Sequence, residues 1–176
     1  TPTDTPAISA DGRYVAFTCS RCRSDASQPA PNPSSAEQIL LYDRVTGTNT
    51  LVSHVPGSPT TPGDGRSIQP RISADGRFVV FAGTATNLVG GQTGPTSQNL
   101  FVFDRTTGAV SLVSHTAGSA TTAANSFSGS PEISRDGRWI VFQSTATDLV
   151  TGQGASPKFS VFLYDRTSGA NLLVSH

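Results

Sequence analysis

A short apolar run behind a polar turn recurs three times along the chain. Residues 131–142 read Pro-Glu-Ile-Ser-Arg-Asp-Gly-Arg-Trp-Ile-Val-Phe, and near-copies stand at residues 70–81 and 6–17. The Ser-x-Asp-Gly-Arg segment predicts a hairpin, because Asp bonds its own backbone in turns and Gly adopts positive φ without steric cost. The hairpin joins a first strand that ends near residue 134 to a second strand over residues 138–142.

The second and third strands of each unit are apolar on both faces. The second strand of the middle unit, for example, reads Phe-Val-Val-Phe. Strands of this kind are covered on both sides. The third strand is expected at residues 39–42, 100–103 and 161–164. A fourth strand begins apolar and turns polar, which is typical of an outer edge, and is expected at residues 51–54, 112–115 and 173–176.

Two further landmarks fix the period of the repeat. Leu-Val-Ser-His closes the units at His54, His115 and His176, which are spaced by 61 residues. Asp-Arg-(Val/Thr)-(Thr/Ser)-Gly begins at Asp43, Asp104 and Asp165 with the same spacing. A constant internal period indicates a repeat architecture. We therefore expect one domain over residues 1–176, divided into units 1–54, 55–115 and 116–176.

A four-stranded antiparallel sheet with two apolar faces must pack against copies of itself. Radial stacking of such sheets gives the β-propeller, which has about 4 to 8 blades. We predict an all-β protein with three blades, which form either half of a six-bladed ring or part of a larger propeller. A β-sandwich also has short, evenly spaced strands, but the constant period favours blades.

The repeated motif resembles a known family. Pro-x-Ile-Ser-x-Asp-Gly-Arg-aromatic-Val-x-Phe is followed by Asn87-Leu-Val or Asp148-Leu-Val and then by Phe-x-(Phe/Tyr)-Asp-Arg-x-x-Gly. This pattern is similar to the TolB-like, WD-repeat-like propeller blades of secreted and periplasmic bacterial proteins. The resemblance implies a propeller in a secreted, periplasmic or cell-surface protein. It implies no single activity, because propellers host many unrelated functions.

Charge and hydropathy argue against several classes of function. The chain has 12 basic and 12 acidic side chains and no net charge, so it lacks the basic surface expected of a nucleic-acid binder. No apolar run approaches the roughly 20 residues of a membrane span, and no signal peptide is visible. The absence of Met indicates a processed product, a fragment or part of a longer molecule.

Two cysteines, Cys19 and Cys22, occur in the first unit and have no counterpart in the other two. We predict a local disulfide between them, which suits an oxidising compartment, although so small a ring removes little chain entropy. A redox pair and half of a zinc site are the alternatives. Zinc would need two further ligands, and the chain has no other Cys.

Long polar loops of equal length connect the units at residues 55–69 and 116–130. Loops on a rigid scaffold often carry binding residues. The candidate recognition residues are therefore Asp64, Arg66, Asn125 and Phe127. The alternative is that these loops are solvated linkers.

No metal or other cofactor is expected. TolB-like blades often carry an acidic Asp-x-Asn-Gly sequence that could hold calcium through oxygen ligands. Here no carboxylate lies between Asn87 and Asp104, and the third unit offers Asp148 alone. A calcium site normally gathers several oxygen donors.

Polar residues that recur in every unit are assigned to turns and sheet packing, not to an active site. The repeated turn residues are Asp11, Gly12, Arg13, Asp75, Gly76, Arg77, Asp136, Gly137 and Arg138. The three His residues also share one repeat position, so no single Ser-His-Asp constellation is distinguished. No catalytic residue is predicted, and an enzyme is disfavoured.

Three blades leave an apolar face at each end, which predicts association with protein, either with itself or with adjoining propeller blades. We therefore expect a non-enzymatic secreted or cell-surface scaffold. Two copies would close a six-bladed ring, whereas a head-to-tail contact that does not close would give a filament. A lectin-like propeller that binds glycans is the alternative, although the chain has one Trp and three Tyr for stacking on sugars. An accessory propeller of a hydrolase ranks third.

Overall fold

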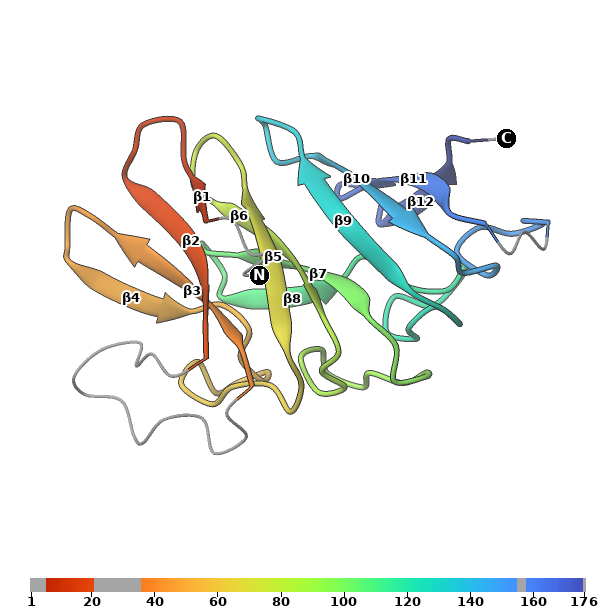
Figure 1. The fold of residues 1–176 in the computed structure, drawn as a ribbon, viewed down its shortest axis with the longest axis horizontal. Coiled ribbons are helices and arrows are strands. Elements are labelled where there is room, and N and C mark those ends of the chain that lie inside the picture. Colours follow the sequence, from red (N-terminus) through yellow and green to blue (C-terminus); the bar gives the residue numbers. More distant parts are fainter. Residues whose placement is uncertain (1–5, 21–35, 155–157, 176) are drawn as a thin grey trace.

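Each repeat folds into one four-stranded antiparallel sheet whose strands follow chain order. The computed structural model describes residues 6–20, 36–154 and 158–175 of the 176-residue chain. The expected all-β architecture of three four-stranded sheets is confirmed. We call these sheets blades 1, 2 and 3, and Figure 1 shows them fanned side by side.

The strands are short and recur in the same order in each blade. Blade 1 contains β1 (Ala7–Ile8), β2 (Tyr14–Cys19), β3 (Gln38–Asp43) and β4 (Thr48–Leu51). Blade 2 contains β5 (Ser67–Ile72), β6 (Phe78–Gly83), β7 (Asn99–Asp104) and β8 (Ala109–Leu112). Blade 3 contains β9 (Ser128–Ile133), β10 (Trp139–Ser144), β11 (Ser160–Asp165) and β12 (Ala170–Leu173). The first strands are neighbours, since β5 contacts both β1 and β9.

The fourth strands lie three residues earlier than the sequence pattern predicts. We expected a strand over residues 51–54, whereas β4 ends at Leu51. The reason is a tight turn in which Gly47 adopts a φ of 71° and donates its N–H to Asp43 O at 2.8 Å. Strand pairing therefore resumes at once, between Asp43 and Thr48. The same turn precedes β8 and β12.

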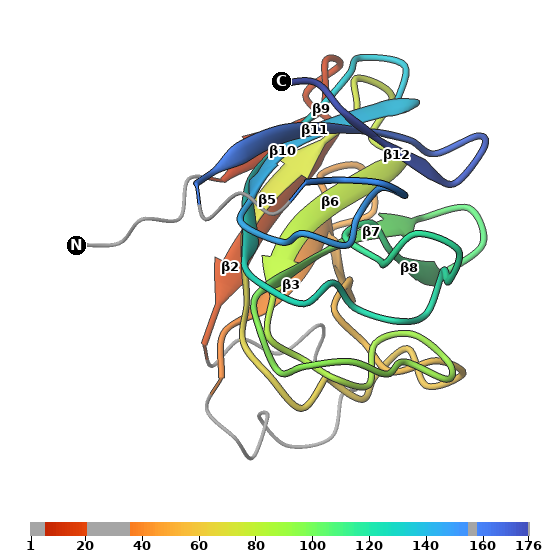
Figure 2. The same cartoon turned by 90° about the vertical axis from the view of Figure 1, so that its right-hand side faces the viewer.

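Two apolar cores hold the blades together. One core joins blade 1 to blade 2 and includes Leu41 and Phe81. The other joins blade 2 to blade 3 and includes Val80 and Phe142. Blade 2 is thus covered on both faces, and all six residues of β6 are buried. Figure 2 shows the same stack from the side of blade 3.

We call these two contacts seam 1–2 and seam 2–3. Because the blades are repeats, the two seams are built from equivalent residues. Phe81 stacks on Phe101 at seam 1–2 with ring centroids 5.6 Å apart, and Phe142 stacks on Phe162 at seam 2–3 at 5.5 Å. One packing solution therefore occurs twice in the chain.

Candidate functional site: the seams and the terminal faces

The Asp-Gly-Arg segments form the turns between the first and second strands. In blade 2 the Asp75 carboxylate accepts hydrogen bonds from the Ser73 hydroxyl at 2.5 Å and from Arg77 N at 3.0 Å. The Ser73 hydroxyl oxygen in turn accepts from Phe78 N at 3.0 Å. In blades 1 and 3 the corresponding bonds from Ser9 and Ser134 lower the pKa of Asp11 and Asp136.

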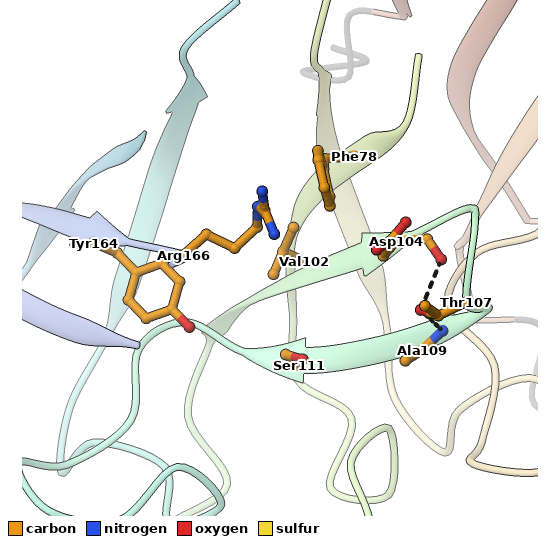
Figure 3. A pocket seen from close by; sticks show the side chains of 8 residues that line it. All are labelled: Phe78, Val102, Asp104, Thr107, Ala109, Ser111, Tyr164 and Arg166. Carbon is orange, nitrogen blue, oxygen red and sulfur yellow. Dashed lines mark hydrogen bonds between the residues drawn. The ribbon is translucent and has the colours of Figure 1, made fainter. Parts of the chain in front are cut away.

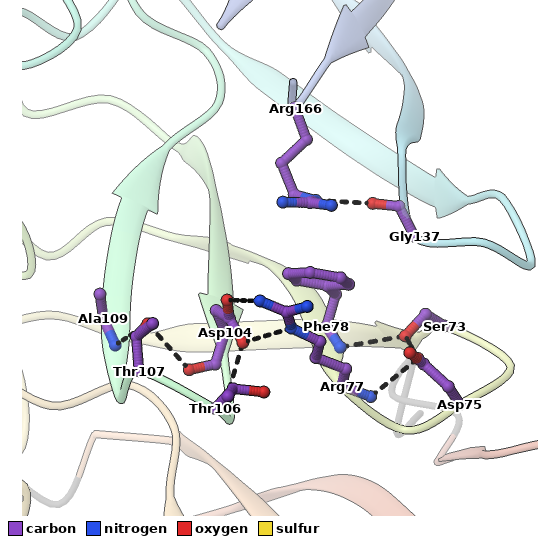
Figure 4. A network of polar contacts seen from close by, with 10 residues as sticks. All are labelled: Ser73, Asp75, Arg77, Phe78, Asp104, Thr106, Thr107, Ala109, Gly137 and Arg166. Carbon is purple, nitrogen blue, oxygen red and sulfur yellow. Dashed lines mark hydrogen bonds and ion pairs between the residues drawn. The ribbon is translucent and has the colours of Figure 1, made fainter. Parts of the chain in front are cut away.

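Each turn arginine forms a bidentate ion pair with the carboxylate that ends the third strand. Arg77 Nε and Nη2 donate to the two Asp104 oxygens at 2.9 and 2.8 Å, and Figure 4 shows this pair. Arg13 pairs in the same way with Asp43, and Arg138 pairs with Asp165. Bidentate pairs of this kind are among the stronger hydrogen-bonded contacts.

These arginines keep their partner carboxylates ionised. The hydrogen bond from Arg138 lowers the pKa of Asp165 to about 2, although partial desolvation opposes the shift. The bond from Arg77 likewise lowers the pKa of Asp104, and the bond from Arg13 lowers that of Asp43. The carboxylates are therefore structural anions and not proton donors at neutral pH.

A second arginine in blade 2 and in blade 3 crosses the seam to the preceding blade. Arg166 of blade 3 places its guanidinium carbon 3.6 Å from the ring centroid of Phe78 in blade 2. Arg105 of blade 2 lies 4.3 Å over the ring of Tyr14 in blade 1. Stacking of guanidinium on an aromatic face is favourable and directional. Figure 4 shows Arg166 above Phe78, with its hydrogen bond to Gly137 O.

Two turn glycines lie against these same rings. A Cβ atom on Gly76 would stand 2.2 Å from Tyr14 Cδ2, and one on Gly137 would stand 2.3 Å from Phe78 Cδ2. Both glycines also have a φ near 70°, which side chains rarely adopt. Glycine is therefore required at these turns by the neighbouring blade as well as by the local backbone.

A hollow of about 180 Å³ opens at seam 2–3, between the third and fourth strands of blade 2 and blade 3. Its charged groups are already engaged, because Asp104 pairs with Arg77 and Arg166 stacks on Phe78. Burial raises the pKa of Tyr164. Figure 3 shows the lining, formed by Phe78, Val102, Asp104, Thr107, Ala109, Ser111, Tyr164 and Arg166.

Two of the four recognition candidates, Asp64 and Asn125, fasten the inter-blade loops to their own blades. The Asp64 carboxylate accepts from Thr86 N at 2.7 Å and from the Thr86 hydroxyl at 2.6 Å. Asn125 Oδ1 accepts from Thr147 N at 3.0 Å. Asp64 and Asn125 are repeat equivalents on different blades, so the structure does not bring them into one site.

The other two candidates also occupy equivalent positions on blades 2 and 3. Arg66 forms an ion pair with Glu37 of blade 1. Phe127 meets Phe159 edge to face, with ring centroids 5.8 Å apart. A recognition role for these four residues stays a prediction.

The cysteine and histidine predictions meet the structure only in part. Cys19 ends β2, whereas Cys22 lies outside the described residues, so the disulfide stays a prediction. His54 packs edge to face on Phe103, and His115 packs in the same way on Tyr164. Both histidines therefore belong to the seams. His176 lies outside the described residues.

The described residues hold neither a metal-binding cluster nor a membrane-spanning helix. Residues 6–20, 36–154 and 158–175 contain no group of three or more His, Cys, Asp or Glu side chains that could hold a metal ion. Over the same ranges, no helix has the length and apolar character needed to cross a membrane.

The terminal faces of blades 1 and 3 carry exposed apolar side chains at positions whose equivalents are packed at the internal seams. On blade 3, Val141 is 38 % exposed and Val174 is 49 % exposed. Their equivalents in blade 2, Val80 and Val113, are both 0 % exposed because blade 3 covers them. On blade 1, Ile8 is 63 % exposed. Positions that are core in the middle of the stack are thus open at its ends.

The sequence matches no protein-family model and no curated protein. Solved structures do match nearly the whole chain. TolB from Acinetobacter baumannii is 17 % identical with a TM-score of 0.51, and the match covers 98 % of this chain and 32 % of that one. A putative TolB from Agrobacterium tumefaciens is 19 % identical with a TM-score of 0.54, covering 98 % and 50 %.

The β-propeller domain of the Trilobed protease from Pyrococcus furiosus is 14 % identical with a TM-score of 0.52, and the match covers 95 % of this chain and 40 % of that one. The chain therefore spans between 32 and 50 % of the length of these three structures. The expected likeness to TolB-like β-propellers is confirmed for the fold. At these identities the likeness concerns the fold alone.

Proposed function

Starting from the fold of TolB-like β-propeller domains, we propose that this chain is a non-enzymatic scaffold that associates with protein through the terminal faces of blades 1 and 3. A secreted, periplasmic or cell-surface location belongs to the same proposal and rests on the family resemblance of the repeats. The observation that carries the proposal is the exposure of apolar side chains at positions that are core elsewhere in the same chain.

The contrast between equivalent positions gives the proposal its physical basis. Val141 and Val174 are 38 and 49 % exposed on one face of blade 3, whereas their equivalents Val80 and Val113 are buried. Leu172 on the same face is 58 % exposed. Covering an exposed aliphatic side chain contributes on the order of 1 kcal/mol, so several together provide a substantial driving force for association. Contiguous apolar patches of this kind mark interaction surfaces.

The repeated polar groups support a scaffold over an enzyme. The bidentate pairs recur in every blade and hold turns and strand ends. The charged groups of the hollow at seam 2–3 bond within the chain. These groups are arranged as supports for the blades, in the same way at each repeat.

Sedimentation velocity of the 176-residue chain over a range of concentrations tests the proposal. We expect species heavier than the 18.2 kDa monomer, and Val141→Glu should shift them to the monomer because it places a charge on the terminal face of blade 3. Ala120→Glu is the matched control, since Ala120 is exposed in the loop between blades 2 and 3. A chain that stays monomeric at every concentration contradicts the proposal.

A further inference from the structure

We propose that the partner of each terminal face is a second copy of this chain, docked head to tail in the register of the internal seams, so that two copies close one six-bladed ring. This inference rests on the proposed function and names its partner. The docking geometry is seen at seams 1–2 and 2–3, and the outer faces of blades 1 and 3 carry the two halves of a third seam of the same kind.

The first element of the register is the arginine stack. At each internal seam an arginine donates Nε to the turn glycine of its own blade and covers the aromatic ring of the preceding blade. Arg166 does so with Gly137 O at 2.8 Å and the Phe78 ring. Arg105 does so with Gly76 O at 3.1 Å and the Tyr14 ring.

Blade 1 carries the arginine half of a third stack. Arg44 donates Nε to Gly12 O at 3.2 Å, as its two equivalents do. No ring among the described residues lies against its guanidinium. Gly12 has the same φ of 69° as Gly76, yet a Cβ on Gly12 would meet nothing within 4 Å. Among the residues that the structure describes, nothing fills the place that an aromatic ring takes at both internal seams.

Blade 3 carries the aromatic half. Trp139 stands at the position of Tyr14 and Phe78, and its own Arg138 lies 4.5 Å over the ring, as Arg77 lies 4.7 Å over Phe78. At the internal seams an arginine of the following blade also covers the ring, and the described residues provide no such arginine for Trp139. Arg44 and Gly12 of a second copy complete this contact.

The second element is a belt of backbone hydrogen bonds between adjacent turns. Ala10 N donates to Ala74 O at 2.9 Å, and Ala74 N donates to Arg135 O at 3.0 Å. Within residues 6–20, 36–154 and 158–175, no hydrogen bond reaches Arg135 N or Ala10 O. In the proposed ring, Arg135 N of one copy donates to Ala10 O of the other, so the belt continues around all six blades.

The third element is an asparagine at the outer part of the seam. Asn171 Nδ2 crosses seam 2–3 and donates to Val113 O at 3.0 Å. Asn49 is its equivalent in blade 1, and Val174 is the equivalent of Val113. Docking of a second copy lets Asn49 Nδ2 donate to Val174 O, which is the contact that Asn171 Nδ2 makes with Val113 O at seam 2–3.

The apolar surfaces complement each other in the same register. Ile72 and Ile133 pack against the cores of the two internal seams. Their equivalent Ile8 is 63 % exposed on blade 1, while Val141 and Val174 are exposed on blade 3. In a third seam, Ile8 of one copy packs against blade 3 of the other copy, and Val141 and Val174 of that copy pack against blade 1.

For the 176-residue chain with its three blades, ring closure requires two copies. Head-to-tail contacts give a ring when the rotation closes and a filament when it does not. Closed propellers have about 4 to 8 blades, a range that contains the six blades of two copies but not the nine of three copies.

Cysteine cross-linking in the full 176-residue chain tests this inference. The chain with both Ala10→Cys and Arg135→Cys is oxidised and digested without reduction, and linked peptides are identified by mass spectrometry. Turn residues at these positions are joined by a 2.9 Å backbone bond at seam 1–2, a proximity that permits a disulfide. We expect a covalent dimer as the main product, in which position 10 is linked to position 135.

Ala10→Cys with Ala74→Cys is the matched control, because it spans seam 1–2 and should link within one chain under the same conditions. A ladder of trimers and longer products, or links that join position 135 to position 135, overturns the ring. In either of those cases the proposed function stands if the chain still associates in sedimentation. A monomer in sedimentation together with absent links overturns both.

Discussion

Arg166 of blade 3 lies flat over Phe78 of blade 2, with the guanidinium carbon 3.6 Å from the ring centroid. The same guanidinium donates to Gly137 O at 2.8 Å, so one side chain fixes the turn of its own blade and the face of its neighbour. The arginine contact joins blades 2 and 3 at the same seam as the apolar core. Together they explain why one motif, repeated with a constant period, produces a stack of sheets in a single register.

Arg166→Ala should weaken seam 2–3 directly. The loss of a partly desolvated stack and of one hydrogen bond is expected to lower the free energy of unfolding by about 1–2 kcal/mol, as measured by urea denaturation. Arg44→Ala is the control, since it removes an equivalent bond to Gly12 O but no stack within the chain. At concentrations where the chain is monomeric, it should cost roughly 0.5 kcal/mol. Equal losses for the two variants would contradict the role assigned to the stack.

Gly76→Ala and Gly12→Ala separate the effect of the seam from that of the backbone. Both glycines have a φ of 69°, so both substitutions strain the turn by about 1 kcal/mol. At Gly76 the new methyl also meets the Tyr14 ring, which adds an overpacking cost of roughly 1–3 kcal/mol. Thermal denaturation should therefore rank Gly76→Ala well below Gly12→Ala. The reverse order would show that the ring does not constrain this turn.

The loops before blades 2 and 3 are held by a carboxylate and an amide whose positions are exchanged between the two blades. In blade 2, Asp64 bonds Thr86 and receives support from Asn87, whereas in blade 3 Asn125 bonds Thr147 and receives support from Asp148. Asn87→Asp alone should destabilise blade 2, because it places two carboxylates side by side.

Adding Asp64→Asn to that variant reproduces the arrangement of blade 3 and should restore stability. A double-mutant cycle with urea denaturation checks this, with an expected favourable coupling of about 1 kcal/mol or more between the two positions. Additive losses would mean that the two side chains act independently.

Acid should destabilise the blades through the three bidentate pairs. The arginines hold the folded pKa of Asp165 at about 2 and lower those of Asp43 and Asp104. An unfolded Asp titrates near ~3.9, so the folded state binds fewer protons than the unfolded state between these values. The stabilisation is therefore complete above about pH 4 and is lost as the pH falls toward about 2.

The melting temperature should stay level between about pH 5 and 7 and fall between about pH 4 and 2. Asp104→Asn removes one of the three pairs, so it should lower the melting temperature at neutral pH and flatten part of the acid response. An acid response of unchanged steepness in that variant would show that the pairs are not its source.

The period of the sequence was sufficient to predict the sheets because every level of the pattern agrees. Gly in the Asp-Gly-Arg turn, two-sided apolar strands and the Asp-Arg-x-x-Gly turn all specify the same blade. The fourth strand was misplaced because Leu51 and Val52 were both assigned to it. In the structure, Leu51 ends the strand and Val52 continues as an apolar cover of seam 1–2.

The seams were less predictable than the blades. The arginines were attributed to turns and packing, but a sequence does not show that Arg105 reaches the ring of another blade. The signal was present in the spacing, since an aromatic always follows the turn and an arginine always follows the third strand. The arginine of each blade reaches back to the preceding blade because of the twist and order of the sheets. This direction is visible in the structure and not in the sequence.

Fluorescence emission of Trp139, the single tryptophan of the chain, tests the central claim most directly. If a second copy docks on blade 3, emission should move to shorter wavelength as the protein concentration rises. Arg44→Ala should then raise the midpoint of that transition about thirtyfold, since the ring has two new seams and each loses roughly 1 kcal/mol. Ala120→Glu should leave the midpoint unchanged. Emission that is independent of concentration, or a midpoint that Arg44→Ala does not move, would contradict the third seam.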